Sequence, residues 1–404
     1  MVHAFSRRGL LVSSGALVAW SHLPRVASAA PARDPRFVFI NLRGALDGLA
    51  AVAPYADPDY ERVRNGLVLP MDGGTAAVRL NEMFALHPAM KTFADLYRQR
   101  EALVVHAVAS PYRERSHFDG QDVLESGLGG VARTSTGWLN RATAAIPSGE
   151  RVNPTEALSV GAAVPLVMRG KAPVVTWLPP GFPAASEQTR DRLLGIYTHV
   201  DVELAGRFEE ALRLERAAVA NPTMGKPEAK RPDTGAFREA GLAAGRLLAR
   251  DDGPRVGTMS FLGWDTHQDE KPLDGQLNRL LGSLDAAIDG LRSELGPVWK
   301  ETVVVVATEF GRTARMNGTL GTDHGTATVA FLAGGALKGG RVIADWPGLS
   351  DARLHDNRDL AATTDIRAVF KGLLRDHLGI GEDRLATDIF PGSIAIKPMG
   401  GLVA

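Results

Sequence analysis

The chain has 404 residues, of which 45% are apolar and 23% are charged, and it contains no cysteine. A chain of this length and composition folds around a real hydrophobic core, as one large domain or two ordinary ones. Lysine plus arginine and aspartate plus glutamate balance at 46 each, which argues against a nucleic-acid-binding protein because such proteins are normally basic. The lack of cysteine excludes disulfides, thiolate metal sites and cysteine nucleophiles.

The first thirty residues resemble an export signal. Arg7 and Arg8 precede a short apolar run at 10–20, and the small-x-small pattern ASA follows at 27–29. Paired arginines, a short apolar core and such a cleavage site are typical of a twin-arginine signal peptide; a buried N-terminal helix is the alternative. The apolar run is shorter than the ~20 residues that span a bilayer. We therefore expect residues 31–404 to form a periplasmic protein, exported by the twin-arginine route and without a membrane span.

Segments with the pattern of buried strands alternate along the mature chain with segments of helical periodicity. The predicted strands lie, in chain order, at 36–44, 103–109, 172–179, 255–262, 301–313 and 327–340. The predicted helices lie in the first part of 87–110 and at 115–127, 236–250, 273–295 and 363–380. Four consecutive valines at 303–306 show no alternation, as expected for a parallel strand covered by helices on both faces. The pattern predicts an α/β fold with a doubly wound, mostly parallel sheet.

One long segment departs from this alternation. Residues 186–220 are helical in pattern and highly charged, and residues 221–235 are rich in proline, glycine and lysine. The second stretch is typical of a surface loop. We interpret 186–235 as a helical excursion from the core of a single domain, and we expect it to roof the functional site.

Polar residues follow the predicted strands where the strands end. In doubly wound sheets, ligands bind outside the carboxyl ends of the strands. Five clusters should meet there: Asp47, then Ser116 with His117, then Asp265 with His267, then Glu309, and finally Asp323 with His324. Imidazoles and carboxylates are ligands for divalent metals. The prediction is a metal site, with zinc as the first choice and calcium, magnesium or manganese as alternatives.

Each of these residues also has a structural interpretation. Asp47 is placed to cap a turn or a helix, Ser116 is a natural helix N-cap, and His267 could be an exposed loop residue. Glu309 is harder to explain without a ligand, because a buried carboxylate costs several kcal/mol unless it is paired. Its partner could be a metal ion, or it could be Arg312 three residues later.

Several motifs resemble a known family. They are INLRGALDGLAAVAPYADPDY, HAVASPYRERSHFDGQDVLESG, GWDTHQ, ATEFGRT and GTDHGTATVAFLAGG. These motifs are similar to an exported bacterial family called domain of unknown function 1501 and, more distantly, to the alkaline phosphatase and sulfatase superfamily. The resemblance covers nearly all of the mature chain. It implies an alkaline phosphatase-like fold and a metal site at the carboxyl edge of the sheet.

The superfamily resemblance also implies roles for individual residues. It matches Asp47 to a metal-binding aspartate, Ser116 to the nucleophile, Asp265 with His267 to a metal-binding pair, and His324 to a late histidine ligand. Glu309 stands where the superfamily has an aspartate followed by a histidine, and here Phe310 follows instead. The sequence is therefore consistent with a single metal ion or with a differently arranged pair.

The activity that follows from this resemblance is hydrolysis of a small anionic phosphate or sulfate ester. Ser116 and His117 would be catalytic, and Arg115 or Arg312 would bind the non-bridging oxygens, since arginine matches such groups with two parallel hydrogen bonds. The alternative is a non-catalytic member of the same fold that binds a metal ion or a partner at this site.

Overall fold

The computed structural model describes residues 34–147, 157–161, 163–178 and 234–404, together with the single positions 194, 198 and 205. The predicted signal peptide and most of the predicted excursion at 186–235 lie outside these residues. Within the part that is described, no helix combines the length and apolar character needed to cross a membrane.

A central sheet of nine strands organises the described residues. Its order is β11-β5-β10-β9-β1-β8-β6-β7, and β12 also pairs with β5. The strands are β1 (Arg36–Arg43), β5 (Ala102–Ala109), β6 (Ala157–Val160), β7 (Val174–Trp177), β8 (Val256–Leu262), β9 (Thr302–Thr308), β10 (Thr328–Ala333), β11 (Arg341–Ile343) and β12 (Thr364–Asp365). Only β10 runs antiparallel to its neighbours, and the other pairs are parallel. The predicted mostly parallel α/β sheet is confirmed.

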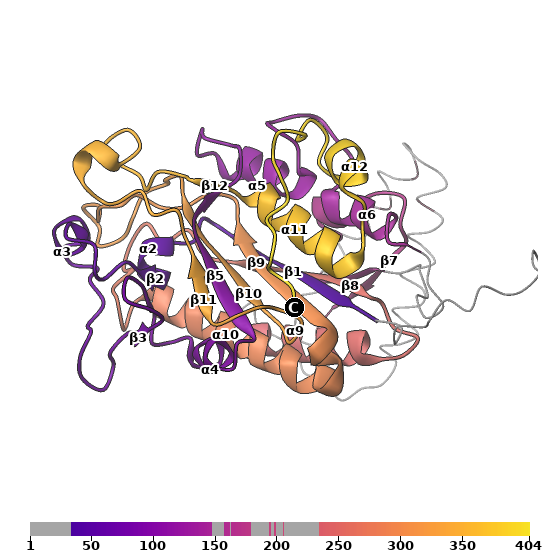
Figure 1. Cartoon of the computed structure of the whole chain (residues 1–404), viewed down its shortest axis with the longest axis horizontal. Coiled ribbons are helices and arrows are strands. Elements are labelled where there is room, and N and C mark those ends of the chain that lie inside the picture. Colours follow the sequence, from indigo (N-terminus) through magenta and orange to yellow (C-terminus); the bar gives the residue numbers. More distant parts are fainter. Residues whose placement is uncertain are drawn as a thin grey trace, which may run out of the picture.

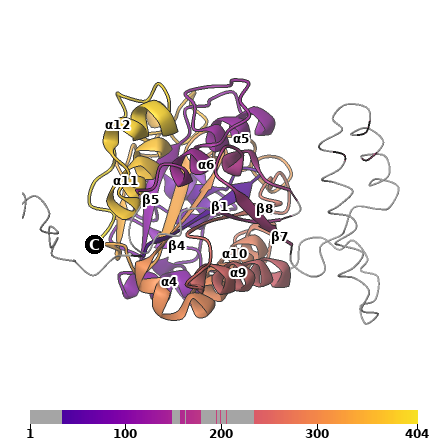
Figure 2. The same ribbon diagram turned by 90° about the vertical axis from the view of Figure 1, so that its right-hand side faces the viewer.

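Helices cover both faces of this sheet (Figures 1 and 2). One face carries α4 (Lys91–Arg98), α9 (Thr234–Ala249) and α10 (Gln276–Leu295), and the other carries α5 (His117–Ser126), α6 (Trp138–Thr143), α11 (Ile366–Leu378) and α12 (Glu382–Arg384). A hydrophobic core lies on each face of the sheet. Alternate side chains of β1 pack into the two cores, with Val38 and Ile40 in the first and Phe37 and Phe39 in the second. This double burial explains why the strand sequences show no polar alternation.

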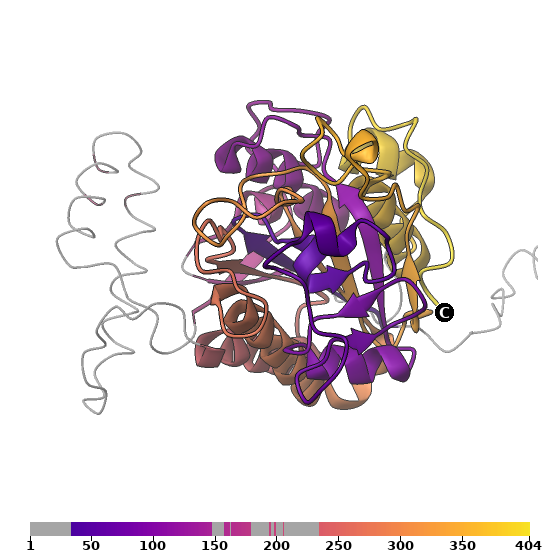
Figure 3. The same cartoon turned by 90° about the vertical axis from the view of Figure 1, so that its left-hand side faces the viewer.

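Further short elements complete the fold. A second sheet of order β2-β4-β3 lies beside the end of β1, at the front in Figure 3. This region contains α2 (Gly48–Ala51), β2 (Val52–Ala53), α3 (Tyr60–Val63), β3 (Val78–Arg79) and β4 (Ala85–Leu86). Short 3₁₀ helices span Leu166–Met168, Gly296–Glu301 and Asp351–Arg353, and a π-helical turn spans Leu385–Ile389. The small sheet, α6 and β6 were not expected from the sequence.

The direction of β10 decides which loops meet. A residue that precedes a strand in a parallel sheet lies at the edge opposite to the carboxyl ends. Because β10 is antiparallel to both β5 and β9, the loop before it lies at the same edge as the loops that follow β1, β5, β8 and β9. All the predicted site residues therefore belong to loops or helix starts at this one edge.

Candidate metal centre

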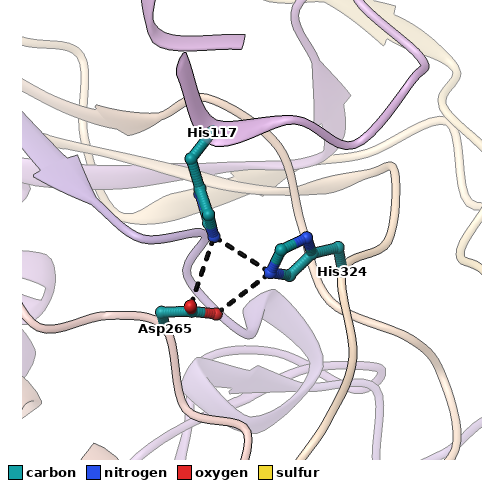
Figure 4. A group of neighbouring side chains, drawn as sticks. All are labelled: His117, Asp265 and His324. Atoms are coloured by element: carbon teal, nitrogen blue, oxygen red, sulfur yellow. Dashed lines mark hydrogen bonds and ion pairs between the residues drawn. The ribbon is translucent and has the colours of Figure 1, made fainter. Parts of the chain in front are cut away.

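Three side chains from distant segments converge at the carboxyl edge of the sheet. His117 is the first residue of α5, Asp265 follows β8, and His324 precedes β10. Figure 4 shows the three side chains pointing toward one another. Each offers one ligand atom within 4.8 Å of the other two. The two Nε2 atoms are 3.0 Å apart, and Asp265 lies 3.4 Å from His117 Nε2 and 3.2 Å from His324 Nε2.

His267 extends this group. Its Nε2 lies 3.0 Å from Nε2 of His324 and 3.1 Å from Oδ1 of Asp265. The three histidines and the aspartate, which come from three separate segments, thus share one location. We call these four residues the His₃Asp cluster.

In each imidazole of the His₃Asp cluster, Nδ1 lies within hydrogen-bonding distance of an acceptor oxygen. The contacts are His117 Nδ1 to Glu309 Oε1 (2.8 Å), His267 Nδ1 to Asp323 Oδ1 (3.2 Å) and His324 Nδ1 to the carbonyl oxygen of Arg115 (2.9 Å). Carboxylate and carbonyl oxygens only accept hydrogen bonds, so we assign the proton of each neutral ring to Nδ1. The Nε2 lone pairs then face one another, which is unfavourable without a cation between them. Acceptors of this kind commonly orient histidine ligands of metals.

Charges around the cluster shift the pKa values of its members. In the metal-free protein, hydrogen bonds to Asp265 and Glu309 raise the pKa of His117 to about 9. Burial alone would raise the pKa of Asp265, but hydrogen bonds from His117, His324 and Arg312 outweigh it and hold that pKa well below its usual range. The site therefore concentrates negative charge that a proton on His117 balances when no metal is present.

The backbone around the cluster explains how these residues are held. Arg115 has a φ of +62°, a left-handed conformation that a side chain disfavours; its carbonyl oxygen contacts His324. Glycines flank the loop that carries His324. A Cβ on Gly321 would lie 2.3 Å from the backbone of His267, and one on Gly325 would lie 2.3 Å from the backbone of Arg312. The glycines in GTDHGT therefore permit the close approach of three loops.

Glu309 lies behind the cluster. It is completely buried after β9, and its carboxylate accepts hydrogen bonds from His117, from the backbone N–H of Gly44 and from Gln121 and Thr308. Burial would raise the pKa of Glu309, but these hydrogen bonds, led by that from His117, lower it. The pairing of Glu309 with Arg312, considered from sequence, is not formed.

Arg312 instead supports Asp265. It is buried, its Nη1 lies 2.5 Å from Asp265 Oδ1, and its other nitrogens donate to the hydroxyl and carbonyl oxygens of Thr322. All three guanidinium nitrogens of Arg312 are engaged in this structure and are out of contact with solvent, so they do not line the open pocket. The guanidinium neutralises a carboxylate of the cluster.

Asp47 lies outside the His₃Asp cluster. Its Oδ1 accepts from the backbone N–H groups of Leu49 and Ala50 at the start of α2, and its Oδ2 accepts from Arg64 at 2.6 Å. Asp47 and Arg64 are both buried. The structure thus gives Asp47 the helix-capping role that the sequence left as an alternative, together with a buried ion pair.

Glu270 adds a second carboxyl group to this ion pair. Burial first, and then the charge of Asp47, raise the pKa of Glu270 well above its ordinary value. One of its oxygens accepts from Thr322 at 2.7 Å, and the other has no hydrogen-bond partner in the described part of the chain. Neither Arg64 nor Glu270 was expected from the sequence, because neither stands in a motif.

Ser116 and Arg115 lie beside the cluster. Ser116 is the N-cap of α5, but its side chain makes no capping hydrogen bond, so its hydroxyl is not used to complete the helix. Arg115 forms ion pairs with Asp359 and Asp356 at 2.8 and 3.2 Å. The roles expected for Ser116 as nucleophile and for Arg115 as an anion-binding residue stay predictions.

An open pocket of about 540 Å³ lies over the cluster. It is lined by Arg115, His267, Asp323, His324 and Arg358. Arg358 was not identified from the sequence, because it stands 34 residues after His324 in a segment with no recognisable pattern. The pocket combines two imidazoles of the cluster with two guanidinium groups, which is suited to an anionic ligand.

The chain belongs to the family described as "Protein of unknown function (DUF1501)", which matches residues 75–390. The family resemblance stated from the sequence is thereby confirmed. No curated protein sequence gives a significant match.

Solved structures with a similar chain trace include enzymes that act on esters. The phosphonate monoester hydrolase of Agrobacterium radiobacter has 12% identity and a TM-score of 0.40, over 86% of this chain and 74% of that chain. BT1596, a 2-O GAG sulfatase, has 10% identity and a TM-score of 0.41, over 90% and 73%. The C-terminal periplasmic domain of EcEptC from Escherichia coli, in complex with Zn, has 9% identity and a TM-score of 0.36, over 76% and 74%.

Proposed function

We propose that this protein is a metal-dependent hydrolase of phosphate or sulfate esters. The observation that carries the proposal is the His₃Asp cluster, in which an acceptor holds the Nδ1 side of each imidazole while the Nε2 atoms and Asp265 face one another. The cluster lies under an open pocket that also contains guanidinium groups. Convergent ligands in a concave site are the usual signature of a catalytic metal centre.

The donor set fits zinc best. Zinc binds imidazole nitrogen and carboxylate oxygen at about 2.0–2.2 Å in a tetrahedron, which places neighbouring ligand atoms roughly 3.3 Å apart. Two contacts between Nε2 atoms, both made by His324, and three contacts of Asp265 with the imidazoles range from 3.0 to 3.4 Å. Calcium and magnesium prefer sites made of oxygen, so three imidazoles argue against them. Manganese remains a weaker competitor for the same ligands.

The proposed reaction proceeds through an ester of Ser116. A bound divalent ion supplies Lewis acidity toward an ester oxygen. Ser116 Oγ, at the N-terminus of α5, attacks phosphorus or sulfur; the bond to the ester oxygen breaks, and the alcohol leaves with a proton. Water then cleaves the serine ester to release phosphate or sulfate. Backbone N–H groups at the start of α5 favour an anion at this position.

We also propose that the protein works in the periplasm after export by the twin-arginine route, on the basis of Arg7, Arg8 and the apolar run that follows them. Its substrate would then be a small anionic ester present outside the cytoplasm.

A second candidate is a non-catalytic member that binds a metal ion without turnover. It is favoured by Asp47, because the ion pair with Arg64 and the helix cap occupy both of its oxygens. It is also favoured by Phe310, which stands next to Glu309 where the superfamily resemblance implies another histidine. Both features remove ligands for a second ion.

The test measures metal content and turnover in the same preparations. Purified protein is analysed for bound metals and assayed with p-nitrophenyl phosphate and p-nitrophenyl sulfate. We expect bound zinc and turnover in the wild type, zinc without turnover in Ser116→Ala, and neither in His324→Ala. Ser293→Ala, an exposed serine on α10, is the matched control and should behave as the wild type. Zinc without turnover on either ester would favour the second candidate, and a wild type that binds no metal would refute both.

A further inference from the structure

Two arginines line the pocket over the His₃Asp cluster, and they are held very differently. Arg115 donates from Nε and Nη2 to Oδ2 of Asp359 at 3.0 and 2.8 Å, and from Nη2 to Asp356 at 3.2 Å. Asp359 is completely buried. Two of the three guanidinium nitrogens of Arg115 are thus committed to carboxylates, which leaves little of its charge for a ligand.

Arg358 is held more loosely at its charged end. Among the described residues, its ion pair is with Oδ1 of Asp359 at 3.3 Å, and its side chain is 39% exposed. A contact of this length and exposure contributes little stability. The guanidinium of Arg358 therefore keeps most of its donors available on the pocket side.

The backbone of Arg358, by contrast, is firmly placed. The two preceding residues, Asp356 and Asn357, have φ values of +53° and +52°. The N–H of Arg358 donates to the carbonyl oxygen of His355, and its carbonyl oxygen accepts from Ala314. Consecutive left-handed residues are costly and are commonly found at functional sites. This turn fixes the backbone that carries the loosely paired Arg358 side chain at the pocket.

We propose that Arg358 is the principal anion-binding side chain of this site, a role that Arg115 and Arg312 do not fill. The ligand is a phosphoryl or sulfuryl group with at least two non-bridging oxygens, because a guanidinium donates two parallel hydrogen bonds to such a group. A pocket of about 540 Å³ leaves room for the organic part of an ester beside it. This inference rests on the proposed function for the identity of the substrate, but not for the binding of the anion.

Inorganic phosphate is the probe, and its affinity for zinc-loaded protein is measured by isothermal titration calorimetry. Arg358→Ala should weaken phosphate binding at least about tenfold, the loss expected for hydrogen bonds to a charged group. Arg358→Lys should recover only part of it, because an ammonium group offers a single point of charge. Zinc affinity should be unchanged in both. Arg353→Ala, an exposed arginine in the neighbouring turn, is the matched control and should bind phosphate as the wild type does.

The inference is overturned if Arg358→Ala binds phosphate as tightly as the wild type, or if the zinc-loaded wild type binds no phosphate at millimolar concentration. Ester turnover in the same preparations separates this inference from the proposed function. Phosphate binding that depends on Arg358 without any turnover would contradict the hydrolase and leave the anion site standing. Turnover with an unchanged KM in Arg358→Ala would contradict the anion site and leave the hydrolase standing.

Discussion

Replacing Glu309 by glutamine tests whether the cluster depends on oriented imidazoles. Oε1 of Glu309 accepts from His117, Gly44 and Gln121 at 2.8, 2.9 and 3.2 Å, and Oε2 accepts from the hydroxyl of Thr308 at 2.8 Å. A glutamine keeps its carbonyl oxygen at the first position and places its amide NH₂ at the second. The Thr308 hydroxyl can rotate and accept there, since it has both a donor and lone pairs. The substitution therefore removes the charge and preserves the shape.

The expected loss in zinc affinity is about tenfold. Removing an acceptor behind a histidine ligand typically costs 10–100-fold in metal affinity, or roughly 1.4–2.8 kcal/mol. The lower end applies because the Nδ1 hydrogen bond of His117 survives and only its acceptor becomes neutral. Zinc affinity is measured by competition with a chromophoric chelator at fixed neutral pH. The control is Asp285→Asn, a buried carboxylate on α10 that accepts from the backbone of Thr92 and Phe93.

The control should keep wild-type zinc affinity, and thermal unfolding verifies that both variants are folded. A folded Glu309→Gln protein with wild-type affinity would show that the carboxylate does not tune His117 for metal binding. Equal losses in both variants would point to a general effect of removing buried charge.

Three further predictions follow from the same contacts. Asp47→Asn should lower the free energy of unfolding, measured by chemical denaturation, by about 3 kcal/mol. This is the lower end for breaking a buried ion pair, and it applies because Glu270 still faces Arg64. The zinc affinity of the folded variant, measured with the chelator, should be unchanged, and a lower zinc affinity would indicate that Asp47 binds the metal. Zinc must displace the proton that His117 holds with a pKa of about 9. Zinc affinity should therefore rise about tenfold per pH unit below that value and then level off. A zinc affinity that calorimetry finds independent of pH would contradict this prediction. The raised pKa of Glu270 means that the folded wild type loses stability as pH rises above the unfolded carboxyl value of 4.5. Glu270→Gln should therefore gain in Tm relative to the wild type as the pH is raised above that value, and a gain that shrinks with pH would be evidence against it.

The sequence predicted the main sheet because most of its strands are buried on both faces. Val303 to Val306 in β9 and Phe37 to Ile40 in β1 show no polar alternation, and the structure packs their alternate side chains into two cores. The strand β6 was missed because Ala157–Val160 contains alanine, leucine and serine, whereas β7, of the same length, consists of the strong strand formers Val-Val-Thr-Trp. The small sheet was missed because two-residue strands carry no pattern at all.

From the sequence, site residues could be predicted only where a metal-binding residue type follows the end of a predicted strand. The structure brings Asp265, His267 and His324, which the sequence grouped as metal ligands, to one edge of the sheet, and it places His117, which the sequence assigned a catalytic role, beside them. Arg64 was missed as the partner of Asp47 because it lies 17 residues away within an irregular segment. Arg358 was missed because its proposed role depends on the contacts of Asp359. Oδ2 of Asp359 pairs closely with Arg115, and Oδ1 pairs more loosely with Arg358. No sequence pattern predicts which arginine takes the closer contact.

The four carboxylates considered as metal ligands have different neighbouring groups, and these neighbours indicate which of them can bind the metal. Asp265 has its oxygens 3.1–3.4 Å from three Nε2 atoms and is 41% exposed, so it is placed to share a metal ion with them. Glu309 and Asp323 contact Nδ1 atoms on the far side of the rings, and moving either to the metal would leave a histidine without its acceptor. Asp47 contacts no imidazole of the cluster, and its two oxygens accept from the start of α2 and from Arg64. The ligand atoms of His117, Asp265 and His324 lie within 4.8 Å of one another, and His267 contacts the last two, so nitrogen and oxygen ligands for one ion are present without recruiting any of the other three carboxylates.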